Sequence, residues 1–187
     1  MALRLVLIRH GETAWTLSGQ HTGRTDIPLT EHGRAVALEL ADRLAGWTFV
    51  RALSSPLSRA RETARLAGYG TDLDTTDDLL EWDYGDYDGR TTEDIRTTNP
   101  RWSLWVDGVP GGESADEVGN RVDRVIEKLS DTEGDVVLFA HGHLLRVLTA
   151  RWLGLPPADG RLFVLDPGTI SVLGYERETP VVLRWNS

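Results

Sequence analysis

Residues 3–12 read Leu3-Arg4-Leu5-Val6-Leu7-Ile8-Arg9-His10-Gly11-Glu12. The first six positions form a nearly continuous apolar run, which predicts a short strand covered on both faces, as in the parallel sheets of α/β proteins. The run then changes directly into charged and polar residues with a glycine among them. In open parallel sheets, ligands bind in the crevice at the carboxyl ends of the strands. The first strand is therefore expected to end at a binding site.

Two further apolar segments have the same form. The segment 50–54 is followed by Ser55-Pro56 and then by Arg59, and the segment 136–140 is followed by His141-Gly142-His143. Because the carboxyl ends of parallel strands lie at one edge of the sheet, the three polar clusters are expected to converge there.

Helices are predicted between these strands. Their signals are capping residues followed by apolar stripes at helical spacing. The predicted helices begin at Thr30, at Ser55-Pro56, at the capping box Ser114–Glu117, and near His143. Two closing strands are predicted over 170–175 and 181–185. Strands that alternate with helices predict an α/β fold, a three-layer sandwich whose mainly parallel central sheet is flanked by helices.

The length of 187 residues suits one domain, spanning 1–187, in which the irregular segment 71–112 forms a small cap. The absence of cysteine excludes a disulfide framework and thiolate metal sites. A net charge of −9 argues against binding to nucleic acid or to an anionic membrane. No apolar run reaches the length of about 20 residues that a membrane span needs, and residues 1–8 lack a signal-peptide cleavage site, so we expect a cytoplasmic protein.

The three polar clusters together offer at least two arginines, several histidines and helix N-termini. Guanidinium groups pair bidentately with phosphate oxygens, and helix N-termini attract anions. Gly11 and Gly142 allow close backbone approach. The chain has no GxxxxGK[ST] segment, so the pattern indicates a phosphate site without a P-loop. A neutral imidazole can attack phosphorus, and neighbouring arginines would disfavour protonation of His10.

Several segments, in this order along the chain, resemble the histidine phosphatase superfamily, which includes the cofactor-dependent phosphoglycerate mutases. The first is Arg9-His10-Gly11, which is similar to that family's RHG motif. The others are similar to its loop before the first helix, its second phosphate-binding segment, its acidic motif and its second histidine. They are His21–Thr30, Ser54–Ala64, Glu81–Gly85 and Ala140–His143.

This resemblance implies roles for individual residues. His10 would become phosphorylated, and Glu81 would act as the general acid. Arg9, Arg59 and a protonated His141 would hold the transferred phosphoryl group. The remaining candidates for substrate binding are Thr16, where many members have asparagine, Thr22 and Gly23, in a loop that closes over the phosphate, and Gly142.

Other residues compete for some of these roles. The carboxylates that compete with Glu81 are Glu12, Asp83, Asp86 and Asp88. Glu113 is a candidate substrate contact, and we interpret His143 as a structural residue.

The resemblance implies a metal-independent phosphomonoester hydrolase that uses a phosphohistidine and no cofactor. Its partner would be a small phosphorylated metabolite such as a sugar phosphate. The compact chain is similar to the branch with acid phosphatases and sedoheptulose-bisphosphatase. Alternatives are a phosphoglycerate mutase, a metal-dependent hydrolase that uses His141 and His143, and a phospholigand-binding module without turnover. The strand 181–185 could pair across a homodimer.

Overall fold

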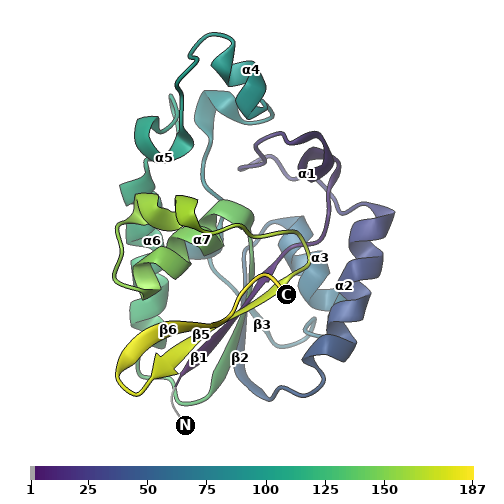
Figure 1. Ribbon diagram of the computed structural model, residues 1–187. Coiled ribbons are helices and arrows are strands. Elements are labelled where there is room, and N and C mark those ends of the chain that lie inside the picture. The colour runs from purple at the N-terminus through teal and green to yellow at the C-terminus, as the bar shows by residue number, and fades with distance from the viewer. Residues whose placement is uncertain (1–2) are drawn as a thin grey trace.

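A six-stranded sheet with helices on both faces forms the centre of the molecule (Figure 1). The computed structural model describes residues 3–187, so the first two residues of the predicted domain lie outside the described part of the chain. The strand order is β3-β2-β4-β1-β5-β6. The predicted three-layer α/β class, with a mainly parallel sheet, is confirmed.

Four of the strands pair in parallel: β1 (Arg4–Arg9), β2 (Phe49–Ser54), β3 (Leu73–Thr75) and β4 (Asp135–Ala140). The strand β5 (Ile170–Glu176) pairs antiparallel with β1, and β6 (Thr179–Arg184) pairs antiparallel with β5. Among the strands of residues 3–187, only β5 therefore runs against the direction of the others. Every residue of β4 is buried, which fits its place between β2 and β1.

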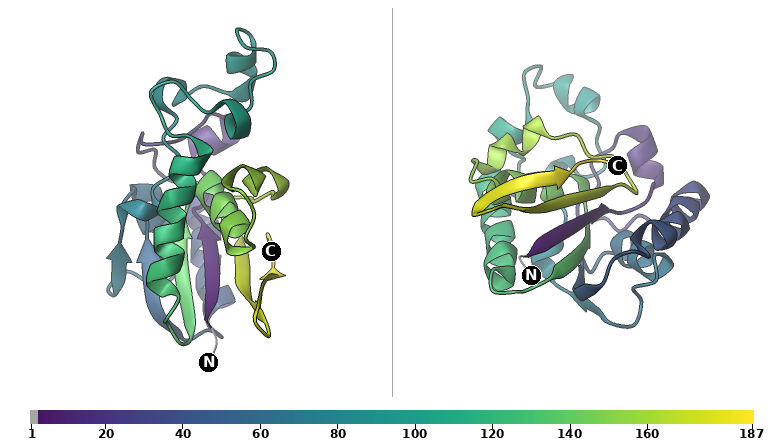
Figure 2. Two further views of the ribbon diagram at one scale, coloured as in Figure 1. Left: turned by 90° about the vertical axis from the view of Figure 1, so that its left-hand side faces the viewer. Right: turned by 60° about the horizontal axis from the view of Figure 1, so that its bottom comes forward.

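The alternation of side chains along each strand divides the core into two layers. On β1, Val6 and Ile8 belong to one apolar cluster, and Leu5 and Leu7 belong to the other. The helices α2 (Glu31–Leu44) and α3 (Ser58–Leu66) cover the first layer, and α6 (Ala115–Leu129) and α7 (Gly142–Trp152) cover the second (Figure 2). The predicted caps at Thr30 and Ser114 are both formed.

The carboxyl ends of β1, β4 and β2 lie side by side, as predicted. Arg9 pairs with Ala140 in the register of β1 and β4, and Ser54 pairs with Phe139 in that of β2 and β4. His10 follows β1 and Ser55 follows β2, and the backbone N–H of each donates to a carbonyl of β4, of Ala140 and Phe139 respectively, at 3.0 Å. The three polar clusters therefore meet at one edge of the sheet.

The predicted helix start at Ser55-Pro56 is wrong, because α3 begins at Ser58. The Ser55 hydroxyl lies 2.7 Å from Nε2 of His141 and does not cap the helix. The free N–H of Ser58 instead donates to the carboxylate of Asp26, at 3.0 and 3.2 Å from its two oxygens. A carboxylate is favourable at a helix N-terminus, where the backbone carries partial positive charge.

The segment 71–112 is only partly a cap. Its short strand β3 joins the sheet, and Trp82 and Tyr84 are buried in the core. The elements that lie beyond the strand ends are α1 (Ala14–Ser18), α4 (Thr92–Arg96) and α5 (Leu104–Asp107) (Figures 1 and 2). Short 3-10 turns complete the chain at Asp77–Leu79, Gly85–Tyr87 and Pro157–Leu162. Within residues 3–187, no helix is long and apolar enough to cross a membrane.

The loop that follows β1 packs closely against the first turn of α2. A Cβ on Gly33 would lie 2.2 Å from the carbonyl oxygen of Glu12, and a Cβ on Gly11 would lie 2.5 Å from that of Gly33. Neither contact can be relieved by rotating a side chain, since both partners are backbone. The two glycines thus let the backbone that carries His10 rest directly on α2.

We expect Gly33→Ala to destabilise the protein by about 1–3 kcal/mol, the usual range for overpacking, although alanine is the better helix former. Urea unfolding measures this change. Gly46→Ala is the matched control, because an added Cβ there meets no atom within 4 Å. A Gly33→Ala protein as stable as the Gly46→Ala protein would contradict this packing.

Candidate active site

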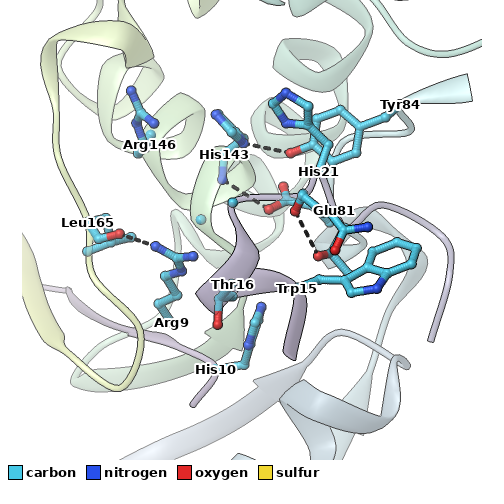
Figure 3. A pocket seen from close by; sticks show the side chains of 14 residues that line it. Arg9, His10, Trp15, Thr16, His21, Glu81, Tyr84, His143, Arg146 and Leu165 are labelled. Carbon is cyan, nitrogen blue, oxygen red and sulfur yellow. Dashed lines mark hydrogen bonds between the residues drawn. The ribbon is translucent and has the colours of Figure 1, made fainter. Parts of the chain in front are cut away.

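A cavity of about 180 Å³ opens where the strand ends meet the cap (Figure 3). Of the residues predicted to form the site, six line it: Arg9, His10, Thr16, Thr22, Glu81 and Gly142. The predicted residues Arg59, His141 and Gly23 are buried behind its wall. The strand ends and the cap loops therefore bring the predicted residues into one region, in two successive layers.

His10 has one ring nitrogen fixed and one free. Its Nδ1 lies 2.7 Å from the carbonyl oxygen of Gly11, which can only accept a hydrogen bond, so Nδ1 carries the proton. Burial, together with the charges of Arg59 and Arg9, lowers the pKa of His10 well below its usual value of 6.5. The ring is therefore neutral, and Nε2 keeps a free lone pair at the cavity wall. That is the form a nucleophilic imidazole needs.

The family resemblance implies a protonated His141, whereas the structure indicates a neutral ring. Its Nδ1 accepts a hydrogen bond from Nε of Arg59 at 3.2 Å, so Nδ1 carries no proton, and Nε2 can donate to the Ser55 hydroxyl. Burial and the charge of Arg59 lower the pKa of His141 well below 6.5. The two imidazoles, with ring centroids 5.2 Å apart, are thus both neutral.

Arg59 is fully buried and holds a loop, and it does not reach the cavity. Its guanidinium donates to the carbonyl oxygens of Thr22, Gly23 and Thr25 at 2.9–3.1 Å. A buried guanidinium needs acceptors for its N–H groups, and the loop carbonyls supply them. The positive charge of Arg59 acts on His10 from this position, while the contact of Arg59 with phosphate stays a prediction.

Arg9 carries a donor with no partner. One terminal nitrogen donates to the carbonyl of Leu165, but Nε is buried and has no hydrogen-bond partner within residues 3–187. A Cβ at position 142 would lie 3.2 Å from both Cζ and Nε of Arg9, so Gly142 gives the guanidinium its place. Burial lowers the pKa of Arg9 from its usual value. Arg9 lines the cavity, so its guanidinium can pair with an anion there.

Glu81 is held at the N-terminus of α7. Its carboxylate accepts hydrogen bonds from the backbone N–H groups of His143 at 3.1 Å, Leu144 at 2.9 Å and Trp82 at 2.9 Å. Among the described residues that line the cavity, it is the one carboxylate. Its competitors are engaged elsewhere or stay outside the cavity: Glu12 accepts from Thr30, Asp83 from Gly85, and Asp88 from Gly23 and Thr25.

The polar groups of the remaining predicted residues mostly form hydrogen bonds within the protein. The Thr16 hydroxyl exchanges hydrogen bonds with the backbone of Thr13 and completes the capping box of α1. The Thr22 hydroxyl donates to the carbonyl of Gln20 at 3.2 Å, and the N–H of Gly23 donates to Asp88 at 2.7 Å. Glu113 lies outside the cavity, where it pairs with Arg121 at 2.6 Å, so the structure does not support it as a substrate contact.

The far end of the cavity holds residues that were not predicted to bind the substrate. His143, which we interpreted as structural, lines the cavity together with Arg146, Tyr84 and His21 (Figure 3). Nδ1 of His143 lies 2.6 Å from the Tyr84 hydroxyl, whose pKa burial raises well above 10. The phenol therefore keeps its proton and donates it, which leaves Nε2 of His143 as a donor. Arg146 follows His143 by three residues on α7, a spacing that places both on one face.

The metal-dependent alternative gains no support from the arrangement of donors. No group of three or more His, Asp or Glu side chains in residues 3–187 is placed to hold a metal ion. Both ring nitrogens of His141 contact Arg59 or Ser55, and Nδ1 of His143 contacts Tyr84.

The family model of the histidine phosphatase superfamily (branch 1) matches residues 5–187. The chain belongs to this superfamily. It is 42% identical over 178 residues to an acid phosphatase from Mycobacterium tuberculosis, covering 92% of this chain and 87% of the relative. It is 34% identical over 188 residues to sedoheptulose 1,7-bisphosphatase from Saccharomyces cerevisiae, covering 81% and 68%.

A solved structure of an open reading frame product from Mycobacterium tuberculosis superposes with a TM-score of 0.94 at 37% sequence identity, covering 98% of this chain and 96% of that one. The superfamily predicted from the RHG motif and its companion segments is confirmed, and with it the assignment of the chain as a phosphatase of this superfamily.

The neutral histidines of this superfamily member predict a pH-dependent stability. Histidine in the unfolded chain titrates near 6.5, whereas burial keeps His10, His141 and His143 neutral well below that value. As pH falls below 6.5, the unfolded chain binds more protons than the folded one, so the free energy of unfolding decreases. Each such histidine contributes a slope of about 1.4 kcal/mol per pH unit.

Urea unfolding between pH 7.5 and 5 measures this slope. We expect His143→Gln to make this slope shallower by about 1.4 kcal/mol per pH unit, because one fewer histidine then differs in protonation between the folded and unfolded chains. Equal slopes in the wild-type and His143→Gln proteins would contradict the assignment of a neutral buried His143.

Proposed function

We propose that the protein hydrolyses phosphomonoesters of small metabolites, such as sugar phosphates, in two steps through a phosphohistidine and without a metal ion. The observation that carries this proposal is the neutral His10, with Nε2 free at the wall of a cavity that Arg9 also lines. A nucleophile and an anion-binding group thus face the same small space.

In the first step, Nε2 of His10 attacks phosphorus in line with the ester oxygen. The P–N bond forms as the P–O bond to the leaving group breaks, and Arg9 stabilises the charge on the phosphoryl oxygens. Arg59 contributes its positive charge from behind the wall. Glu81 gives its proton to the departing alkoxide.

In the second step, water attacks phosphorus on the side that the leaving group has vacated. Glu81, now a carboxylate, takes a proton from this water, the P–N bond breaks, and inorganic phosphate leaves. The backbone N–H groups at the start of α7 support the carboxylate form that this step requires.

The far end of the cavity supports a polar leaving group. Arg146 and the Nε2–H of His143 are donors, and neither Arg146 nor Arg9 forms an ion pair with a carboxylate among residues 3–187. Hydroxyl groups, or a second anionic group, on the metabolite would satisfy these donors. A sugar phosphate has the chemistry that this end of the cavity can bind.

We expect Glu81→Gln to reduce kcat by about 100-fold to 10,000-fold on alkyl phosphates, the usual contribution of a general acid. The first step on aryl phosphates should be affected far less, because a phenolate leaves without a proton. Single-turnover measurements on both substrate classes make the comparison. Equal losses on the two classes would remove Glu81 from the role of acid.

A screen of sugar phosphates, bisphosphates and phosphoglycerates distinguishes the remaining activities. We expect one inorganic phosphate to be released for each ester consumed, with no change after treatment with a chelator. Dependence on a bisphosphorylated primer with little phosphate release would instead identify a mutase, and inactivation by the chelator would identify a metal-dependent enzyme.

A further inference from the structure

Glu81 stands on backbone that has no regular structure of its own. Residues 80–84 belong to no helix or strand, and they connect the 3-10 turn Asp77–Leu79 to the turn Gly85–Tyr87. A general acid must nevertheless be held at a fixed distance from the leaving oxygen. Other groups have to fix this segment, and the proposed function does not use them.

Arg121 binds this segment from the side of α6. Its guanidinium donates to the carbonyl oxygens of Asp78 at 3.1 Å, Leu80 at 2.9 Å and Glu81 at 3.3 Å. The residue is buried, with 9% of its surface exposed. One rigid side chain therefore fixes the backbone on the N-terminal side of Glu81 and at Glu81 itself.

Glu113 binds the same segment on the C-terminal side of Glu81. Its backbone N–H donates to the carbonyl of Asp83, and its carboxylate accepts from the N–H of Asp83, both at 2.9 Å. Its carbonyl accepts from Nε1 of Trp82 at 2.8 Å. The carboxylate also receives a bidentate pair from Arg121, at 2.6 and 2.8 Å. The two side chains thus form one rigid unit around the backbone of Glu81.

We propose that the Arg121–Glu113 pair is the positioning element of the general acid, which fixes the backbone of Glu81 while the N-terminus of α7 fixes its carboxylate. This inference rests on the proposed function, since it assigns the pair an effect on catalysis only through Glu81. Neither residue lines the cavity. A misplacement of a catalytic group by about 1 Å can cost about 100-fold in rate, so a small shift of this segment would be measurable.

Arg121→Lys is the direct test, because lysine keeps the charge but loses the planar fork that reaches three carbonyls and a carboxylate. We expect kcat on alkyl phosphates to fall by about 10-fold to 100-fold and the single-turnover rate on aryl phosphates to change by less than about 3-fold. The matched control is Asp123→Asn, which breaks the Asp123–Arg151 pair of the same helix and should leave both rates unchanged.

A double variant separates positioning from general loss of structure. If the pair acts only through Glu81, adding Arg121→Lys to Glu81→Gln should cause no further loss on alkyl phosphates. Equal losses on alkyl and aryl phosphates, or a further loss in the double variant, would overturn the proposal. If Arg121→Lys does not fold, Glu113→Gln carries the same expectation. A Glu81→Gln protein that shows no leaving-group effect would instead contradict the proposed function itself.

Discussion

A buried imidazole can act as a nucleophile only if one ring nitrogen is kept free of a proton, and His10 meets this condition through the hydrogen bond of its Nδ1 to the carbonyl of Gly11. The geometry of that bond depends on the fold. The loop after β1 lies flat against α2 because Gly11 and Gly33 have no Cβ, and His10 itself is tied to β4 by its backbone. The reactive nitrogen is therefore positioned by backbone contacts on both sides of the sheet edge.

The arginines of the site keep their positive charge because most of their hydrogen bonds go to neutral carbonyl oxygens. Arg9 and Arg146 donate to the backbone carbonyls of Leu165 and Gly160, respectively. Arg59 donates to the carbonyls of the loop 22–25, and its guanidinium also lies 3.8 Å from the carboxylate of Asp26. A carbonyl oxygen accepts a hydrogen bond from a buried N–H and leaves the charge of the guanidinium unchanged. A carboxylate would accept the same hydrogen bond but would also neutralise the charge. A chain with a net charge of −9 can thus present a cationic surface at one small cavity. The same charges, together with burial, keep the histidines neutral.

The sequence predicted the parts of the site that lie on regular elements. Runs of apolar residues defined β1 and β4, so Arg9, His10 and His141 could be located at the strand ends before any coordinates. The sequence did not reveal the true start of α3, because Asp26, thirty-two residues away, supplies the cap. It also could not show that Arg59 holds a loop or that Glu113 pairs with Arg121, since both contacts depend on how irregular segments fold over the sheet. One signal was not used: the i, i+3 spacing of His143 and Arg146 predicts that both lie on one face of a helix, and in the structure both line the cavity.

The most direct test is to stop the reaction during turnover and locate the phosphoryl group on the protein. Acid-labile phosphohistidine survives alkaline quenching, so peptide mass spectrometry after such a quench can identify the modified residue. We expect one added phosphoryl group on His10 and none on His141 or His143. We also expect that His10→Ala neither becomes labelled nor releases phosphate. A labelled residue other than His10, or full turnover by His10→Ala, would contradict a phosphohistidine at His10.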